Sequence, residues 1–155
     1  MSDQVSPIPE AYGRVTPYLI ADNANDAIAF YTKVFGAVEV MRISGPGDMV
    51  GHAEFKIGDS VMMIADAFPD MGFKSPKAYG GTPVSSCLYV EDADAVFAAA
   101  VEAGATVLKP IEDQFYGDRS GTVTDPFGHV WTIASRIEEL SAEEVQARAA
   151  KMFGA

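Results

Sequence analysis

The segment YLIADNA at residues 18–24 reappears in altered form as LYVEDA at residues 88–93. Each is a short apolar run that ends in an acidic or amide residue and leads into an Ala-rich stretch, which stops at a Gly-Ala pair. The two Gly-Ala pairs lie 68 residues apart, and GDSVMMIA at 58–65 matches GHVWTIAS at 128–135 with an offset of 70. Such self-similarity indicates two copies of one supersecondary unit.

The elements within each copy follow from the spacing of their apolar residues. In residues 24–35 and again in residues 93–101, apolar side chains recur at i, i+3, i+4 and i+7, which predicts a helix with one buried face. Alternation in residues 52–57 places Ala53, Phe55 and Ile57 on one face of a strand, under the helix. The Gly-Asp pair at 58–59 then turns the chain into a second strand, so that the two form a hairpin.

Each copy therefore reads as strand, helix and three strands, and the predicted fold class is α+β with two βαβββ modules. We expect the first module at residues 14–68, the second at 82–137 and a C-terminal helix at 139–153. A four-stranded sheet with one helix buries only one of its faces, so paired modules should form a cup-shaped mixed sheet within a single domain. The concave side of the cup is where a ligand is expected.

Charge and cysteine usage exclude several classes of function. The 155 residues include 22 Asp and Glu against 11 Lys and Arg, a net charge of −11, which argues against nucleic acids and anionic membranes as partners. No stretch approaches the ~20 apolar residues of a membrane span. The single cysteine, Cys87, excludes an intramolecular disulfide and a Cys-rich zinc site, and its apolar neighbours predict a buried thiol. The N-terminal residues lack the features of a signal peptide, so a cytoplasmic location is expected.

Four motifs carry a resemblance to a known family: TPYL at 16–19, AIAFY at 27–31 with FGA at 35–37, QFYGDRSG at 114–121, and DPFGHVW at 125–131. With them the chain, over about residues 15–135, resembles the vicinal oxygen chelate superfamily of glyoxalase I, ring-cleaving dioxygenases and bleomycin-resistance proteins. Within that superfamily it looks most like the PhnB-like branch. The resemblance implies the paired-module fold and a homodimer, but no particular reaction, because this fold hosts unrelated chemistries.

The metal enzymes of this superfamily hold their ion with four residues, usually His and Glu, on the concave face. Carried over residue by residue, those positions fall at Thr16, Met62, Ser85 or Ser86, and Thr132. A thioether and hydroxyls do not suit first-row divalent metals, which prefer imidazole, thiolate or carboxylate. We therefore expect no metal at these positions and no cofactor.

Other residues offer chemistry without the usual metal. If Val61, Met63 and Ala65 pack under the helix, then Met62, Ile64 and Asp66 point into the cup. His52 and Glu54 would face the cup as well, and His52 would approach Asp66 at the open end of the hairpin, where a His beside a carboxylate can act as a general base. The alternative is that His52 and Glu54 form a solvated rim and Asp66 caps a turn.

The second module contributes a polar, aromatic loop at residues 114–119. Arg119 can clamp a carboxylate or phosphate of a ligand; alternatively it forms an ion pair with Asp113 or Asp118 that fixes the loop. Tyr116 can stack on a flat ligand or belong to the core.

Three functions stay open on this basis. The first is metal-free binding of a small aromatic or amphipathic molecule that contacts Tyr18, His52, Met62, Tyr116 and Arg119. The second is a lyase, isomerase or oxygenase type of enzyme, using His52, Glu54 or Asp66 with no metal or a displaced one. The third is a collapsed cup with a structural or protein-interaction role. The sequence leaves the choice between binding and catalysis undecided.

Overall fold

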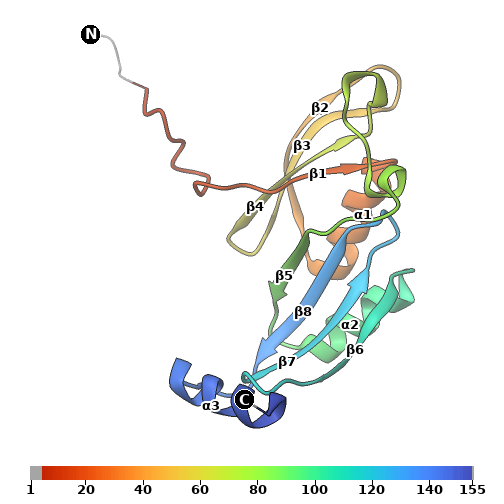
Figure 1. The fold of residues 1–155 in the computed structure, drawn as a ribbon. Coiled ribbons are helices and arrows are strands. Elements are labelled where there is room, and N and C mark those ends of the chain that lie inside the picture. The colour runs from red at the N-terminus through yellow and green to blue at the C-terminus, as the bar shows by residue number, and fades with distance from the viewer. Residues whose placement is uncertain (1–4, 155) are drawn as a thin grey trace. The chain divides into compact units, whose positions relative to one another are not determined.

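A computed structural model describes residues 5–154, and the chain divides into two compact units, one ending at Ala78 and the other beginning at Tyr79 (Figure 1). Each unit contains a strand, a helix and three further strands in chain order. The predicted α+β class with a repeated βαβββ module is therefore confirmed. No helix among residues 5–154 has the length and apolar character needed to cross a membrane.

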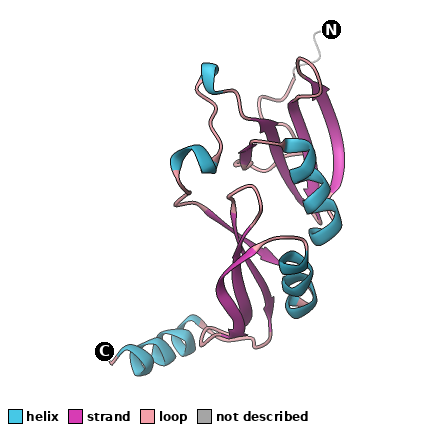
Figure 2. Cartoon of the chain, turned by 90° about the vertical axis from the view of Figure 1, so that its right-hand side faces the viewer, coloured by secondary structure: helices cyan, strands magenta, loops and turns pink. Residues whose placement is uncertain are grey.

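The first unit consists of β1 (Tyr18–Ala21), α1 (Ala24–Phe35), β2 (Val38–Ser44), β3 (Val50–Ile57) and β4 (Ser60–Asp66). Its strands lie in the order β1-β4-β3-β2, with β1 parallel to β4 and the other neighbours antiparallel. One face of this sheet is covered by α1 (Figure 2). The opposite face is called the open face below.

The apolar stripe of α1 forms the core of the first unit. The helix begins at Asn23, whose side chain accepts a hydrogen bond from the Asp26 N–H, and ends at Gly36, whose φ of 69° is left-handed. Tyr31 is fully buried and stacks on Phe55 of β3 with ring centroids 5.4 Å apart. The expected packing of β3 under the helix is thus correct.

The register between β3 and β4 reverses the faces expected for β4. The two-residue turn pairs Ile57 with Ser60, so Phe55 lies opposite Met62 and Glu54 lies opposite Met63. Met62 therefore points toward α1 with Phe55, and it is only 5% exposed. The prediction that Met62, Ile64 and Asp66 face the cup is wrong, because a strand shifted by one residue presents every side chain on the other face.

The second unit repeats this plan with β5 (Ser85–Tyr89), α2 (Ala93–Glu102), β6 (Thr106–Asp113), β7 (Asp118–Thr124) and β8 (Val130–Arg136), followed by α3 (Ala142–Phe153). Its strand order is β5-β8-β7-β6. Gly121 of β7 allows α2 to pack closely, since a Cβ at this position would lie 2.5 Å from a ring carbon of Phe97. Trp131 is buried and donates a 2.9 Å hydrogen bond from Nε1 to Asp125.

The two units correspond with an offset of 69 residues at their last strands. In the first, Asp66 accepts a hydrogen bond from the Ala24 N–H at the start of α1; in the second, Ser135 accepts one from the Ala93 N–H at the start of α2. Thr132 therefore corresponds to Met63 rather than to Met62. The turn before β8 is longer than the Gly-Asp turn before β4, and this length difference made the offset of 70 misleading.

The same register resolves two details of β5. Cys87 lies beside Thr132, whose hydroxyl meets that of Thr122 on the face opposite α2. Ser85, two residues before Cys87, shares this face, so of the two alternatives Ser85 rather than Ser86 lies on the face where the resemblance expects a metal ligand. Cys87 is exposed, and the expectation of a buried thiol is wrong.

Candidate functional site

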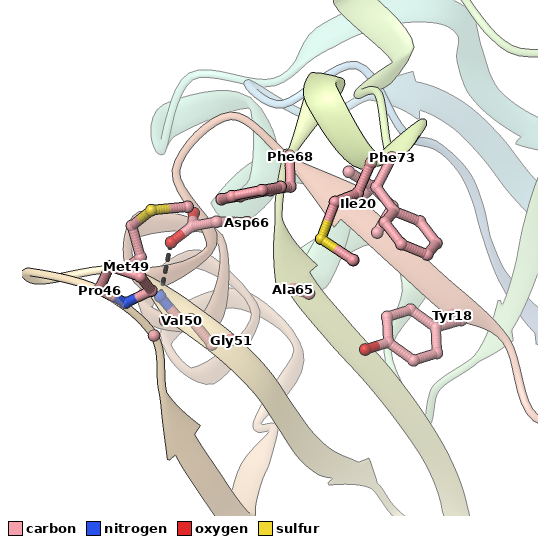
Figure 3. A pocket seen from close by; sticks show the side chains of 12 residues that line it. Tyr18, Ile20, Pro46, Met49, Val50, Gly51, Ala65, Asp66, Phe68 and Phe73 are labelled. Carbon is pink, nitrogen blue, oxygen red and sulfur yellow. Dashed lines mark hydrogen bonds between the residues drawn. The ribbon is translucent and has the colours of Figure 1, made fainter.

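A cavity of about 610 Å³ lies in the first unit, above one end of its sheet. Tyr18 and Ile20 of β1 and Ala65 of β4 contribute its floor from the open face. Two loops, at residues 45–49 and 68–73, supply the walls (Figure 3). In that view Pro46 and Met49 lie on the left, Phe73 and Tyr18 lie on the right, and Phe68 is between them.

A small hydrogen-bonded loop holds apolar side chains at the cavity. The Phe68 N–H donates to the Phe73 carbonyl at 2.7 Å, and the Phe73 N–H donates back to the Phe68 carbonyl at 3.2 Å. Gly72, with φ of 84°, makes the turn between them possible. The loop presents Phe68, Met71 and Phe73, which are respectively 36%, 69% and 52% exposed, so the cavity has an apolar rim open to a ligand.

The opposite wall is the loop that joins β2 to β3. The Gly45 N–H donates to the Met49 carbonyl at 2.8 Å, and Gly47 has a left-handed φ of 65°. Gly51 permits the close approach of the two strands, because a Cβ there would lie 3.2 Å from the Ile43 carbonyl oxygen. This loop positions Met49, whose flexible thioether can adapt to the shape of a ligand.

A chain of four hydrogen-bonded side chains begins at the floor of the cavity. The Tyr18 hydroxyl lies 2.7 Å from Nδ1 of His52, and Nε2 of His52 lies 2.8 Å from Oε2 of Glu54. The Tyr12 hydroxyl donates to Oε1 of the same carboxylate. Glu54 is only 5% exposed, whereas Tyr18 is 49% exposed and lines the cavity. The chain therefore links a buried carboxylate to a hydroxyl that a ligand can reach.

The charges along this chain are set by its hydrogen bonds. Hydrogen bonds from His52 and Tyr12 lower the pKa of Glu54, so the carboxylate is favoured in its ionised form. Burial and the charge of Glu54 raise the pKa of Tyr18, and the hydrogen bond to Glu54 raises the pKa of Tyr12. Both phenols consequently stay neutral around one negative charge.

Asp66 borders the cavity, but its carboxylate accepts hydrogen bonds from backbone N–H groups. Its Oδ1 accepts from the Ala24 N–H at 2.7 Å and its Oδ2 accepts from the Val50 N–H at 2.6 Å. The expected approach of His52 to Asp66 does not occur, since both ring nitrogens of His52 are engaged by Tyr18 and Glu54. The capping alternative describes Asp66, although the element that it caps is α1.

In the second unit, the candidate ligand-binding side chains form ion pairs and hydrogen bonds with other residues of the same unit. Arg119 bonds Asp94 of α2 at 2.7 and 2.8 Å and Asp113 at 2.9 Å, which places it on the α2 side of its sheet. The ion-pair alternative thus holds for Asp113. For Asp118 it does not: Asp118 accepts a 2.7 Å hydrogen bond from Tyr89 and, with burial, raises the pKa of that phenol to about 12.

Tyr116 also belongs to the second unit. Its hydroxyl lies 3.4 Å from Oγ of Ser120, and its ring meets that of Phe115 edge-on at 5.2 Å. Of the five residues expected to touch a ligand, Tyr18 lines the cavity of the first unit and His52 lies directly behind it. Met62 does not line this cavity, because it packs under α1.

Sequence reasoning missed Tyr12 and the walls of the cavity. Phe68 is the last residue of the expected first module, and Phe73 lies between the two expected modules. FPDMGF at 68–73 nevertheless combines turn residues with aromatic ones, and that combination was the available signal. Tyr12 precedes the first predicted module, and no periodicity marks it.

The donor set for the family's metal does not fit. The four corresponding positions are Thr16, Met63, Ser85 and Thr132, which offer hydroxyls and a thioether. Within the described part of the chain, no three His, Cys, Asp or Glu side chains gather in a way that could hold a metal ion. That the protein binds no metal at these four positions stays a prediction.

Comparison with known proteins places the chain in a family. The model of the glyoxalase/bleomycin resistance protein/dioxygenase superfamily matches residues 12–133. An uncharacterized protein of Mycobacterium bovis is 46% identical over 136 residues, which cover 86% of this chain and 90% of that one. An uncharacterized protein of Arabidopsis thaliana is 31% identical over 123 residues, covering 75% of this chain and 74% of its own.

Solved structures agree with the fold. An Arabidopsis thaliana gene product superposes with a TM-score of 0.64 at 29% identity, covering 79% of this chain and 98% of that one. A Bacillus cereus PhnB protein gives a TM-score of 0.62 at 22% identity, covering 79% of this chain and 99% of that one. A Listeria monocytogenes fosfomycin resistance protein complexed with Mn(II) and sulfate gives a TM-score of 0.65 at 19% identity, covering 88% of this chain and 97% of that one. The latter two support the fold alone. On the family match and the sequence relatives together, the chain belongs to the glyoxalase/bleomycin resistance protein/dioxygenase superfamily.

Proposed function

We propose that this protein binds a small aromatic or amphipathic molecule, without a metal, in the cavity of its first unit. The observation that carries the proposal is the cavity itself, about 610 Å³ in volume and walled by Phe68, Phe73 and Met49. Ligand sites are of this size, and they combine an apolar lining with a few polar groups. Here the polar end is Tyr18, backed by His52.

The lining favours a flat apolar body over a small charged acid. Aromatic rings gain from edge-to-face or offset contacts with other rings, and thioethers adapt to irregular shapes. Asp66 is the charged residue among those that line the cavity, and both of its carboxylate oxygens already accept backbone hydrogen bonds. Among the described residues that line the cavity, a ligand that carried a carboxylate would therefore meet no cationic side chain.

Binding in the cavity can be tested with 2-naphthol, whose hydroxyl can both donate and accept a hydrogen bond, as a probe and amide NMR spectra of labelled protein. We expect chemical-shift changes at Ile20, Met49 and Ala65. Phe73→Ala removes one wall ring, at a cost of about 1–1.5 kcal/mol or roughly tenfold in affinity. The matched control is Met152→Ala, at a residue of α3 that is 63% exposed. Changes confined to the second unit, or none at all, would contradict the proposal.

A second candidate is an enzyme of the lyase, isomerase or oxygenase type. The Tyr18–His52–Glu54 chain supports it, because a hydroxyl, a base and an orienting carboxylate lie in hydrogen-bond succession. Asp66 is a weaker candidate for this role, given its two backbone partners. Turnover of a bound molecule, abolished by His52→Gln while binding persists, would favour the enzyme over the binding protein.

We also propose that the protein is a homodimer. β2 is an edge strand, and all seven of its residues are exposed, including Val38, Val40 and Ile43. Exposed apolar edges favour association, and two-fold pairing is its commonest form. Light scattering at micromolar concentration should give twice the chain mass of 16.5 kDa. A mass of one chain would count against the dimer.

A further inference from the structure

The hydrogen-bond directions in the chain behind the cavity can be worked out from its buried end. An ionised carboxylate only accepts hydrogen bonds, and Glu54 accepts one from the Tyr12 hydroxyl at Oε1. Its other oxygen lies 2.8 Å from Nε2 of His52, so Nε2 must carry a hydrogen and donate it. The carboxylate thus selects the tautomer of the imidazole, as an orienting acid does in a triad.

The tautomer of His52 also sets the direction of its hydrogen bond to Tyr18. A neutral imidazole with its hydrogen on Nε2 presents a lone pair at Nδ1, and the Tyr18 hydroxyl lies 2.7 Å from that atom. Tyr18 therefore donates its single hydrogen to His52. What the hydroxyl has left for the cavity is its oxygen lone pairs, on a residue that lines the cavity and is half exposed.

We infer that the polar end of this cavity is a hydrogen-bond acceptor, so that its ligand carries an O–H or N–H donor on an aromatic or amphipathic body. This inference rests on the proposed binding function and narrows the ligand class. Phenols, aryl alcohols, indoles and aromatic amines meet the description. Molecules whose only polar group is a carbonyl or an ether would place an acceptor against an acceptor, at the cost of an unmade hydrogen bond.

The tautomer of His52 can be observed without any ligand. Long-range proton–nitrogen correlation spectra distinguish Nδ1–H from Nε2–H imidazoles, and His129→Gln removes the signals of the other histidine. We expect the Nε2–H form for His52. A ring protonated at both nitrogens, or at Nδ1 alone, would overturn the inference, because Tyr18 would then receive a hydrogen bond and direct its own hydrogen into the cavity.

One isosteric substitution should reverse the direction of both hydrogen bonds that His52 makes, to residue 54 and to Tyr18. In Glu54→Gln the amide oxygen can still accept from Tyr12, while the amide nitrogen donates to Nε2 of His52. The imidazole hydrogen then moves to Nδ1, and the Tyr18 hydroxyl turns from acceptor into donor toward the ligand. The spectra of this variant should show the Nδ1–H form. The matched control is Glu102→Gln at the end of α2, which should leave the tautomer unchanged.

Binding completes the test with two probes of similar shape, 2-naphthol as a donor and 2-methoxynaphthalene as an acceptor only. The measured quantity is the ratio of their dissociation constants, compared between proteins so that differences in probe hydrophobicity cancel. We expect Glu54→Gln to shift this ratio about tenfold toward 2-methoxynaphthalene, and Glu102→Gln to leave it unchanged. Tyr18→Phe should lower the preference for 2-naphthol by a similar factor.

The possible outcomes separate the inference from the proposed function. If neither probe binds in the first unit, the proposed function fails. If both bind in the cavity and the ratio is the same in the wild type, Glu54→Gln and Tyr18→Phe, the cavity binds small molecules and the inferred polarity is wrong. A stability measurement on each variant ensures that only folded protein is compared.

Discussion

Asp66→Asn decides whether the acidic residue at the cavity acts on a ligand or on the fold. Its two oxygens accept hydrogen bonds from the N–H groups of Ala24 and Val50 at 2.7 and 2.6 Å. The asparagine amide keeps one acceptor and sets an NH₂ group against the second N–H. The substitution therefore removes one charge-assisted hydrogen bond at least, worth about 1.5–3 kcal/mol.

Heat denaturation followed by circular dichroism measures this loss. A protein of this length loses roughly 2–4 °C in Tm per kcal/mol, so Tm should fall by about 3–12 °C. Asp59→Asn is the matched control, since Asp59 is exposed in the β3–β4 turn and should change stability by less than about 0.5 kcal/mol. Below Tm, the folded Asp66→Asn protein should bind 2-naphthol within about twofold of the wild type.

The opposite pattern would refute this reasoning. A variant that keeps the wild-type Tm but loses affinity for 2-naphthol would show that the Asp66 carboxylate acts on the ligand. Its backbone hydrogen bonds would then be incidental to stability, and Asp66 would return as a candidate site residue.

Three further outcomes are expected. Gly121→Ala should lower the free energy of unfolding, measured by denaturant titration, by about 1–3 kcal/mol, because the new Cβ would lie 2.5 Å from a ring carbon of Phe97 and 3.0 Å from the Ile111 Cα. Gly13→Ala is the control, since the nearest atom to its Cβ is 3.8 Å away, and it should cost nothing measurable. The pKa of Glu54 is lowered in the folded protein, so its ionised carboxylate stabilises the protein at neutral pH, and this contribution is lost as the pH falls through the folded-state pKa. The free energy of unfolding of the wild type should therefore fall more on acidification than that of Glu54→Gln. Elemental analysis of protein purified without chelator should find far less than one nickel, zinc or iron per chain, and stoichiometric metal would contradict the expected donor mismatch.

The parts of the fold that depend on local pattern were predictable from the sequence. The helical periodicity before Gly36 and the alternation around Phe55 each define an element and its buried face. The face of β4 was not predictable, because Val61 to Ala65 is apolar on both faces and only the pairing of Ile57 with Ser60 fixes its register.

The candidate site was predictable only in part. His52 and Glu54 were found because they alternate with core residues on one strand. Their partners Tyr18 and Tyr12 lie 34 and 42 residues away in sequence, and no spacing rule joins groups that meet only through tertiary structure. The cavity walls come from loops, whose positions depend on glycine conformations rather than on hydrophobic periodicity.

The offset of 69 residues between the last strands determines where chemistry can be engineered into either half. Guided by the sequence alone, a protein engineer restoring a carboxylate ligand to the first half would choose Met62, beside Phe55 and beneath α1. A charge there would be buried without a partner and would unfold the module rather than equip it. The substitution belongs one residue later, at Met63, where the side chain shares the open face with Glu54 and Tyr18. Residues transferred between the halves therefore have to be matched by strand register. Alignment by Gly58 and Gly128 would place each β4 side chain on the wrong face of the sheet.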